Sequence, residues 1–528
     1  MRNVKILHLF PLIILFYSCQ YPILKINEID KSLLSNEPVI KEPVKVYLKD
    51  NSVIVLNDGF VLKDKKLTGD GTRYYFNGKA KLGQQTFSID STIAITTIIS
   101  EMPTSRSVGS FLMGITSVPL TFLGIYCLAC PKCCFGSCPT IYTSLNDKEI
   151  KAELFSSSIG KYLKTNDLDR IAELNEKRND FSITVTNEAL ETHFIDKLRL
   201  KAVYHQKVSS VYNNSQGEFV SIFNPKNNYD AVNSKGETIT PNLLFDDGVY
   251  YRTFDKSELS KKQENEFFDF VELTIRKKND VDHIKLLFKY RNTLLSTILF
   301  YDIVLASQGI KAINWLNKID IDETYSNEFK KVYDIFSGIK LSYFKNGKWT
   351  KIIDLPDAGP LSWKYIAEKI DVTGMGEEIR IRLNFFKDNI MIDYIGIDTD
   401  LTPDDFKIVN LSPSKISLNQ RDATMEIMDA VSHTDENYLI TDPGDKINLN
   451  YEIENKENQQ LTLFIESNGY YKEWIRGNWI TNNNSNYIFN LSDIQGTIKQ
   501  LQNSWIENRE IVEAEFFRTR VPLKGEMP

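Results

Sequence analysis

Short runs in which apolar and polar residues alternate, closed by turn residues, recur along most of the chain. The first run spans Val44 to Leu48, and turns around residues 51 and 58 separate it from the apolar runs that follow. A period of two places successive side chains on opposite faces of a strand, and Asn and Gly between such runs are typical of tight antiparallel turns. The pattern predicts a small β domain over residues 43–96.

The middle of the chain, residues 143–330, combines this β pattern with one helical stretch. Strands are predicted at residues 181–185, 195–203, 267–275 and 283–290. Residues 294–307 are instead apolar on nearly every face of a helix, apart from Asp302, and Gly309 provides a C-terminal stop. We therefore expect an α+β core region with one buried helix, in which Asp302 is either a satisfied buried acid or a functional carboxylate.

Residues 331–400 form the most regular β stretch. An alternating run at 339–344 leads into a turn at Asn346-Gly347, Trp349 begins the return strand, and further runs follow at 379–383 and 390–397. This stretch resembles the last strands of a jelly-roll of the galactose-binding kind, a frequent sugar- or protein-binding module. Trp349 and Trp363 would then either stack on a sugar ring or belong to the sandwich core.

Residues 401–528 predict a C-terminal β domain that includes an aromatic segment. A turn before residues 446–451 and a strand at 461–466 precede Tyr470, Tyr471, Trp474 and Arg476. Tyr, Trp and Arg dominate the binding energy of protein interfaces where they are exposed. These four residues are a candidate binding surface if they are exposed, and the alternative is that they pack against the preceding sheet.

The composition favours several packed domains. The 528 residues are 42 % hydrophobic and 25 % charged, and a single core stops growing well below this length. The net charge is −7 with scattered Lys and Arg, so we expect no nucleic-acid partner. The predicted fold class is mainly β with some α (α+β overall): a multidomain chain with a small N-terminal β segment, β-sandwich or jelly-roll-like modules and one buried helix.

The N-terminus has the pattern of a secretory signal peptide. Arg2 and Lys5 precede an apolar run that ends at Phe16, and a small residue stands directly before Cys19. This arrangement resembles a bacterial lipoprotein signal, in which the cysteine is acylated and becomes the new N-terminus; the alternative is a plain secreted protein. We expect residues 1–18 to be removed, Cys19 to be lipidated and residues 19–42 to be a tether. Gln20 after the cysteine favours the outer membrane.

Residues 97–142 are an apolar and cysteine-rich segment. The stretch from Ser107 to Pro131 carries no charge and is long enough to cross a hydrocarbon core of about 30 Å. Pro119 and three glycines interrupt it, which disfavours one continuous helix. The segment is therefore either buried in the protein or embedded in a membrane. Its end carries Cys127, Cys130, Cys133, Cys134 and Cys138.

The spacing of these cysteines does not fit a metal site. Cys127, Cys130 and Cys133 are spaced as in a ferredoxin loop, but four residues rather than three separate Cys133 from Cys138, and no histidine lies nearby. In an oxidising compartment the alternative is one or two disulfides with a thiol left over. We expect disulfides among the five, in a pairing that the spacing leaves open, and neither a metal nor another cofactor.

A set of short motifs extends over most of the chain from Val44 onwards. The most specific is Cys-Phe-Gly-Ser-Cys-Pro-Thr-Ile-Tyr at residues 134–142, and others lie at 153–159, 167–169, 187–193, 291–295, 299–302 and 469–471. Together they resemble an uncharacterised family of bacterial lipoproteins of the Bacteroidetes type. The resemblance implies that the parts belong together in a cell-envelope protein, and it implies no activity.

Common catalytic signatures are absent from the sequence. The segment around Glu188 and His193 lacks the two histidines one helical turn apart that a metalloprotease needs, and no nucleophile elbow or phosphate-binding glycine loop occurs. His193 and His205 are expected to be structural, and no residue is predicted to be catalytic.

We therefore expect a cell-envelope lipoprotein with a non-enzymatic binding or assembly role at the outer membrane, contacting envelope proteins or glycans. One alternative is a hydrolase acting on polysaccharide or cell-wall material. Another is an inner-membrane protein held by residues 109–130.

Overall fold

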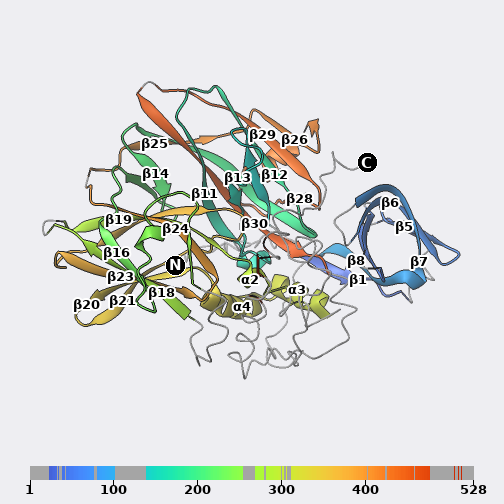
Figure 1. Cartoon of the computed structure of the whole chain (residues 1–528). Helices are drawn as coiled ribbons and strands as arrows, with labels where there is room; N and C mark the ends of the chain where they lie inside the picture. The colour runs from blue at the N-terminus through green and yellow to red at the C-terminus, as the bar shows by residue number, and fades with distance from the viewer. Residues whose placement is uncertain are drawn as a thin grey trace, which may run out of the picture.

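The computed structural model describes residues 23–31, 34, 39–41, 43–50, 52–56, 58–75, 80–101, 138–253, 268–278, 281–298, 300–301, 305, 311–400, 402–422, 425–456, 458–475, 505, 509–510 and 513. Within them the chain is mostly β and forms a small N-terminal β domain and two larger β-sandwiches, with short helices beside them (Figure 1). The predicted class, mainly β with some α in several domains, is confirmed.

The N-terminal β domain is an eight-stranded antiparallel sheet that curls around its own core (Figure 1). Alternate residues of the first predicted run, Val44, Val46 and Leu48, point into this core, as the period of two requires. Strands β4 and β6 approach so closely that a Cβ at Gly71 would lie 1.9 Å from the carbonyl oxygen of Val55. The strands are β1 (Ile23–Glu28), β2 (Val39–Ile40), β3 (Val44–Leu48), β4 (Val53–Leu56), β5 (Phe60–Lys63), β6 (Lys66–Tyr74), β7 (Ala80–Ser88) and β8 (Thr92–Glu101).

Strands β1 and β2 lie in the stretch predicted as a tether, residues 19–42. Strand β1 pairs with β8 from Ile23 opposite Glu101 to Glu28 opposite Thr96, and β2 pairs with β5. The hydrogen-bond partners that make these segments strands come from other parts of the chain. The pattern of apolar and polar residues within 19–42 therefore did not predict β1 and β2.

The first sandwich packs two sheets around a common core, and each sheet combines segments from both ends of the main body. The longest pairing joins β13 and β30 from Glu191 opposite Glu473 to Gln206 opposite Gln459. One sheet holds β9 (Thr140–Thr143), β10 (Ala152–Glu153), β12 (Asp180–Thr186), β26 (Lys415–Leu418), β27 (Arg421–Asp422) and β29 (Lys446–Glu452). The other holds β11 (Thr165–Leu174), β13 (Glu191–Gln206), β25 (Phe406–Leu411), β28 (Leu439–Thr441) and β30 (Gln459–Glu473).

The second sandwich is inserted between β13 and β25 of the first. Its two sheets enclose a separate core that includes Leu273, Phe288 and Ile381. The five-stranded sheet holds β16 (Tyr229–Asn233), β18 (Phe268–Arg276), β20 (Ile339–Lys345), β21 (Lys348–Leu355) and β23 (Glu378–Phe386), and the four-stranded sheet β17 (Tyr251–Arg252), β19 (His283–Asn292), β22 (Lys364–Asp371) and β24 (Ile390–Asp398). The hairpin β14 (Ser210–Asn213) and β15 (Phe219–Ile222) lies beside the four-stranded sheet.

This arrangement differs from the predicted sequence of domains. The jelly-roll-like module expected at residues 331–400 takes strands from residue 229 onwards, because β18 pairs with β23 and β19 pairs with β24. The regions predicted as 143–330 and 401–528 share the first sandwich. Pairing between distant strands leaves no mark on local periodicity, so the boundaries were not visible in the sequence.

Three of the described α-helices lie between β19 and β20, and the short α5 (Met425–Ala430) lies between β27 and β28. Helix α2 (Leu295–Ile298) begins where the buried helix was predicted, and Thr293 Oγ1 accepts a hydrogen bond from the Leu295 backbone N–H. Asp302 and Gly309 lie outside the described residues. Helices α3 (Ala312–Ile321) and α4 (Glu323–Phe336) follow, and the Asp322 side chain caps α4 by accepting from the Tyr325 backbone N–H. In the described part of the chain, no helix has the length and hydropathy to cross a bilayer.

Candidate functional site: a cleft between the two sandwiches

A cleft of about 460 Å³ opens between the first sandwich, helix α4 and the second sandwich. The first sandwich contributes the loop after β10 and the start of β11, and the second contributes the facing ends of β20 and β21. This volume is within the range of ligand sites in proteins. The lining is polar and partly aromatic, with hydroxyl, carboxylate, ammonium and phenyl groups, and includes Ser156, Ser157, Thr165, Asp167, Ser215, Phe329, Lys330, Tyr333, Asp334, Ser337, Lys340, Asp354 and Asp357.

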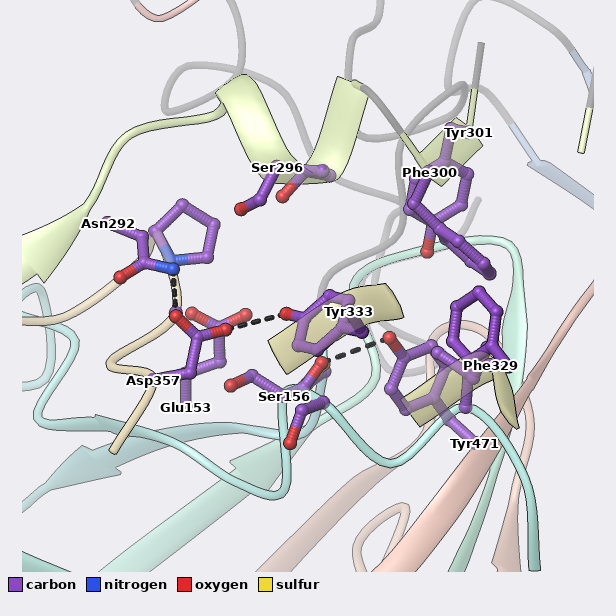
Figure 2. A pocket seen from close by; sticks show the side chains of 16 residues that line it. Glu153, Ser156, Asn292, Ser296, Phe300, Tyr301, Phe329, Tyr333, Asp357 and Tyr471 are labelled. Carbon is purple, nitrogen blue, oxygen red and sulfur yellow. Dashed lines mark hydrogen bonds between the residues drawn. The ribbon is translucent and has the colours of Figure 1, made fainter. Parts of the chain in front are cut away.

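A smaller chamber of about 40 Å³ adjoins the cleft (Figure 2). The two spaces share Ser156, Ser157, Phe329, Tyr333 and Asp357 in their linings. Beyond these shared residues the chamber is lined by β10, the end of β19, α2, the loop before β22 and β30. It is therefore built where both sandwiches and the inserted helices meet.

Asp357 is held at the boundary between cleft and chamber by two hydrogen bonds. Tyr333 Oη donates to its Oδ2 at 2.6 Å, and Asn292 Nδ2 donates to its Oδ1 (Figure 2). Burial, together with the Asp357 charge, raises the pKa of Tyr333 well above its ordinary value. The phenol therefore stays neutral and remains a donor. Helix α4 presents Tyr333 and Phe329 one turn apart on the same face.

Glu153 is the second carboxylate of the chamber and is 4 % exposed. The Leu361 backbone N–H donates to its Oε2 at 2.9 Å. Gly359 has a φ of +71°, and a Cβ at that position would lie 2.4 Å from the same Oε2. Only glycine therefore lets the loop before β22 lie against the carboxylate.

Aromatic rings form the side of the chamber that faces the two carboxylates (Figure 2). Phe300 lies 5.9 Å from Phe329 and 5.3 Å from Tyr301, measured between ring centroids. Tyr471 from β30 closes this side, and its Oη donates to the Ser156 carbonyl oxygen at 3.1 Å. The chamber thus combines aromatic faces with anionic oxygens.

A charged triad joins the two sandwiches beside the cleft. Lys364 Nζ of β22 lies 2.9 Å from Oδ1 of Asp167 and 3.0 Å from Oδ1 of Asp169, both on β11. Burial, reinforced by the charge of Asp167, raises the pKa of Asp169 to about 7. Burial alone would lower the pKa of Lys364, but the two carboxylates outweigh it and raise that pKa above its usual value. Asp169 therefore titrates near neutral pH.

Of the sites predicted from cysteines, only Cys138 lies in the described part of the chain. It is a free, buried thiol that lines the chamber, with its Sγ 3.7 Å from the Ser156 carbonyl oxygen. Burial, and then Glu153, Glu191 and Glu473, raise its pKa well above the ordinary value. One of the five cysteines was expected to keep a free thiol, and Cys138 has one, so the predicted disulfides stay a prediction. Cys19, Cys127, Cys130, Cys133 and Cys134 lie outside the described residues.

The aromatic segment proposed as an exposed binding surface is buried instead. Tyr470, Tyr471 and Trp474 are 1 %, 5 % and 1 % exposed, so packing is the alternative that holds for them; Arg476 lies outside the described residues. The Trp474 ring is covered by the N-terminal β domain, with the Tyr74 centroid 5.5 Å away. Exposure could not be deduced from residue types, because the domain that covers Trp474 lies at the other end of the chain.

The two tryptophans weighed as sugar-stacking residues have cations over their rings. The Arg382 guanidinium carbon lies 4.0 Å from the Trp349 centroid and 3.8 Å from that of Phe270. The Arg291 guanidinium carbon lies 4.9 Å from the Trp363 centroid. These ring faces are engaged within the chain.

The histidines expected to be structural are buried. His193 Nε2 lies 2.7 Å from Glu191 Oε1, and burial lowers the pKa of His193 to about 3. His205 Nε2 lies 2.9 Å from Thr462 Oγ1. Neither residue lines the cleft or the chamber.

No catalytic or binding motif in the sequence marks Glu153, Asn292, Tyr333 or Asp357. A signal was nevertheless present in the motifs that carry the lipoprotein resemblance. Each of five chamber residues comes from a different one of those motifs: Cys138, Glu153, Asn292, Tyr301 and Tyr471. The motifs thus meet around one space in the folded chain.

The solved structures that resemble this chain include an allantoicase and two carbohydrate-active enzymes, all with low TM-scores. Neither a family model nor a curated protein matches the chain. An allantoicase structure is 8 % identical over 44 % of this chain and 81 % of its own, with a TM-score of 0.18. A cycloalternan-forming enzyme from Listeria monocytogenes is 11 % identical over 66 % of this chain and 30 % of its own chain, with a TM-score of 0.16. A GH31 alpha-xylosidase from Xanthomonas citri is 10 % identical over 85 % of this chain and 38 % of its own chain, also with a TM-score of 0.16. At these TM-scores the likenesses carry no argument about fold or function.

Proposed function

We propose that this protein is a lipid-anchored lipoprotein of the bacterial cell envelope that binds a glycan, without cleaving it, in the cleft between its two sandwiches. The observation that carries the proposal is the lining of the cleft. The lining includes hydroxyl groups of Ser157, Thr165 and Ser337, the carboxylates of Asp334 and Asp354, and aromatic rings. Hydroxyls and carboxylates pair with sugar hydroxyls, and aromatic faces pack on the apolar faces of sugar rings.

The alternative, a hydrolase acting on polysaccharide, is favoured by one observation. Glu153 and Asp357 both line the chamber, and pairs of carboxylates catalyse glycoside hydrolysis. Both oxygens of Asp357, however, already accept hydrogen bonds, and Glu153 Oε2 accepts one from the backbone. As hydrogen-bond acceptors, the two carboxylates match the hydroxyl and amine donors of a bound sugar. Binding is therefore the better supported function.

The proposed location in the cell envelope rests on the N-terminal sequence. Residues 1–18 have the signal pattern, Cys19 is the acylation site, and Gln20 favours the outer membrane. Membranes from cells making Cys19→Ala test this address. Release of the variant into the soluble fraction supports the lipid anchor and excludes an inner-membrane protein held by residues 109–130. Full retention in the membrane would overturn the lipid anchor.

Isothermal titration of the full chain in detergent micelles tests glycan binding. The probes are cello-, malto- and chito-oligosaccharides, glucosamine oligosaccharides and muropeptides. We expect one class to bind, and we expect Phe329→Ala in the cleft to weaken it while Phe344→Ala on the outer face of the second sandwich does not. Absence of binding in every class, or equal binding by the Phe329 variant, would overturn the proposal. Release of reducing ends from a bound probe would instead favour the hydrolase.

A further inference from the structure

The described lining of the chamber at the end of the cleft is acidic. Glu153 and Asp357 line it, and none of the described residues that line it is Lys, Arg or His. The Arg291 guanidinium interacts electrostatically with Glu153. This guanidinium lies over the Trp363 ring, and its Nη1 donates a hydrogen bond to the Pro360 carbonyl oxygen at 3.3 Å. The raised pKa of the Cys138 thiol reflects burial and the negative potential of Glu153, Glu191 and Glu473. The space itself therefore favours a positive charge.

A buried hydrogen-bond acceptor in the same wall lacks a donor. Asn292 lines the chamber and is 1 % exposed, and its Oδ1 has no hydrogen-bond partner among the described residues. Its Nδ2 is engaged with Asp357. Buried amide oxygens without a partner are rare in folded proteins, because the lost hydration is not replaced. A ligand N–H would supply the missing donor.

The opposite wall consists of aromatic rings. Figure 2 shows Phe300, Tyr301, Phe329 and Tyr471 across the chamber from the two carboxylates. Aromatic faces attract cations, and rings grouped around a space form the usual receptor for ammonium groups. A volume of about 40 Å³ leaves room for roughly three water-sized groups. That is enough for an ammonium group with its first carbons and too little for a sugar ring.

We infer that the chamber binds a primary ammonium group of the ligand, so that the cleft selects an amino sugar with a free amine over the neutral or N-acetylated sugar. The ammonium donates hydrogen bonds toward the carboxylates and Asn292 Oδ1, and the aromatic wall packs against its other side. The inference rests on the proposed function in that the rest of the glycan occupies the adjoining cleft.

The test compares the full chain in detergent micelles with two trisaccharides that differ only at nitrogen, the β-1,4-linked trimer of glucosamine and that of N-acetylglucosamine. We expect the glucosamine trimer to bind roughly tenfold tighter, the factor typical of one hydrogen bond to a charged group. Glu153→Gln, which keeps an acceptor for the Leu361 N–H, should remove this preference. Asp422→Asn should retain it, because Asp422 is an exposed carboxylate that lines neither the cleft nor the chamber.

Binding of methylammonium chloride tests the ammonium site of the chamber independently of glycan binding in the cleft. We expect it to bind, by saturation-transfer NMR, to the wild type and to Asp422→Asn, and not to Glu153→Gln. Ser157→Lys, which places an ammonium beside the chamber, should block methylammonium and serves as the second variant if Glu153→Gln fails to fold.

The outcomes are distinct. Equal affinity for the two trimers, or no binding of methylammonium to the wild type, overturns the inference and leaves glycan binding standing wherever a trimer binds. Methylammonium binding that is lost in Glu153→Gln, without binding of either trimer, upholds the ammonium chamber and counts against these glycans as ligands.

Discussion

The ammonium of Lys45 in the N-terminal β domain lies 4.1 Å from the centroid of the Trp474 ring, at the end of the last strand of the first sandwich. Trp474 Nε1 also donates to Thr192 Oγ1 at 2.9 Å, and Tyr74 Oη donates to the Pro443 carbonyl oxygen at 2.8 Å. The N-terminal β domain is therefore docked on the main body through a tryptophan that the sequence suggested for an external partner.

Replacing Trp474 should loosen this docking. Trp474→Ala leaves a large cavity and removes the hydrogen bond to Thr192. We expect the free energy of unfolding to fall by about 3–5 kcal/mol. Deuterium uptake at the amides of β3 and β6 should rise. Trp349→Ala, a half-buried aromatic on the second sandwich, is the matched control and should leave that uptake unchanged. Unchanged uptake in Trp474→Ala would contradict docking through this ring.

The same contact should make stability depend on pH in the alkaline range. Burial, opposed by Asp442, lowers the pKa of Lys45 from 10.5 to about 8. Between these two values the unfolded chain binds more protons than the folded chain, so the free energy of unfolding rises with pH. Relative to Lys45→Met, the wild type should gain on the order of 2 kcal/mol from pH 8 to pH 10. Urea denaturation at several pH values measures this, and parallel pH profiles for the two proteins would refute it.

Asp169 should act in the opposite direction near neutral pH. Its pKa is raised from 3.8 to about 7 in the folded chain, so between these values the folded state binds more protons and stability falls as pH rises. Asp169→Asn removes the titrating group. Its free energy of unfolding relative to wild type should increase by on the order of 2 kcal/mol between pH 5 and pH 8. Asp354→Asn, at an exposed carboxylate, is the control, and a pH-independent difference for Asp169→Asn would rule out the assignment.

Gly359 and Gly374 have the same backbone conformation but different surroundings, so substituting each separately distinguishes the cost of a positive φ from the cost of a steric clash. Gly359 and Gly374 have φ values of +71° and +72°, but a Cβ at Gly359 meets Glu153 Oε2 whereas one at Gly374 meets nothing within 4 Å. Gly374→Ala should cost about 1 kcal/mol through its φ alone. Gly359→Ala should cost more and should displace Glu153. Thermal denaturation and methylammonium binding measure both effects; equal destabilisation with binding intact would show that Glu153 does not depend on this approach.

Much of the local structure was readable from the sequence. The alternation after Val44 predicted β3, and the apolar stretch from residue 294 located the start of α2. Helix α4 was missed although Tyr325, Phe329 and Phe336 recur on one face, because charged residues separate them and the mean hydropathy is low. The candidate carboxylates were missed because Glu153 and Asp357 are ordinary acids in short loops or strands, far apart in the chain.

The sequence by itself determined the β-rich class, the strand-forming segments and the absence of common catalytic motifs, since these depend on residue periodicity and composition over a few positions. Tertiary structure alone decided that the second sandwich is inserted in the first, that Trp474 is covered by the N-terminal β domain, and that Glu153, Asn292 and Asp357 line one chamber. These relationships arise from pairing and packing between distant segments, whose free energy depends on the whole folded chain rather than on any local pattern.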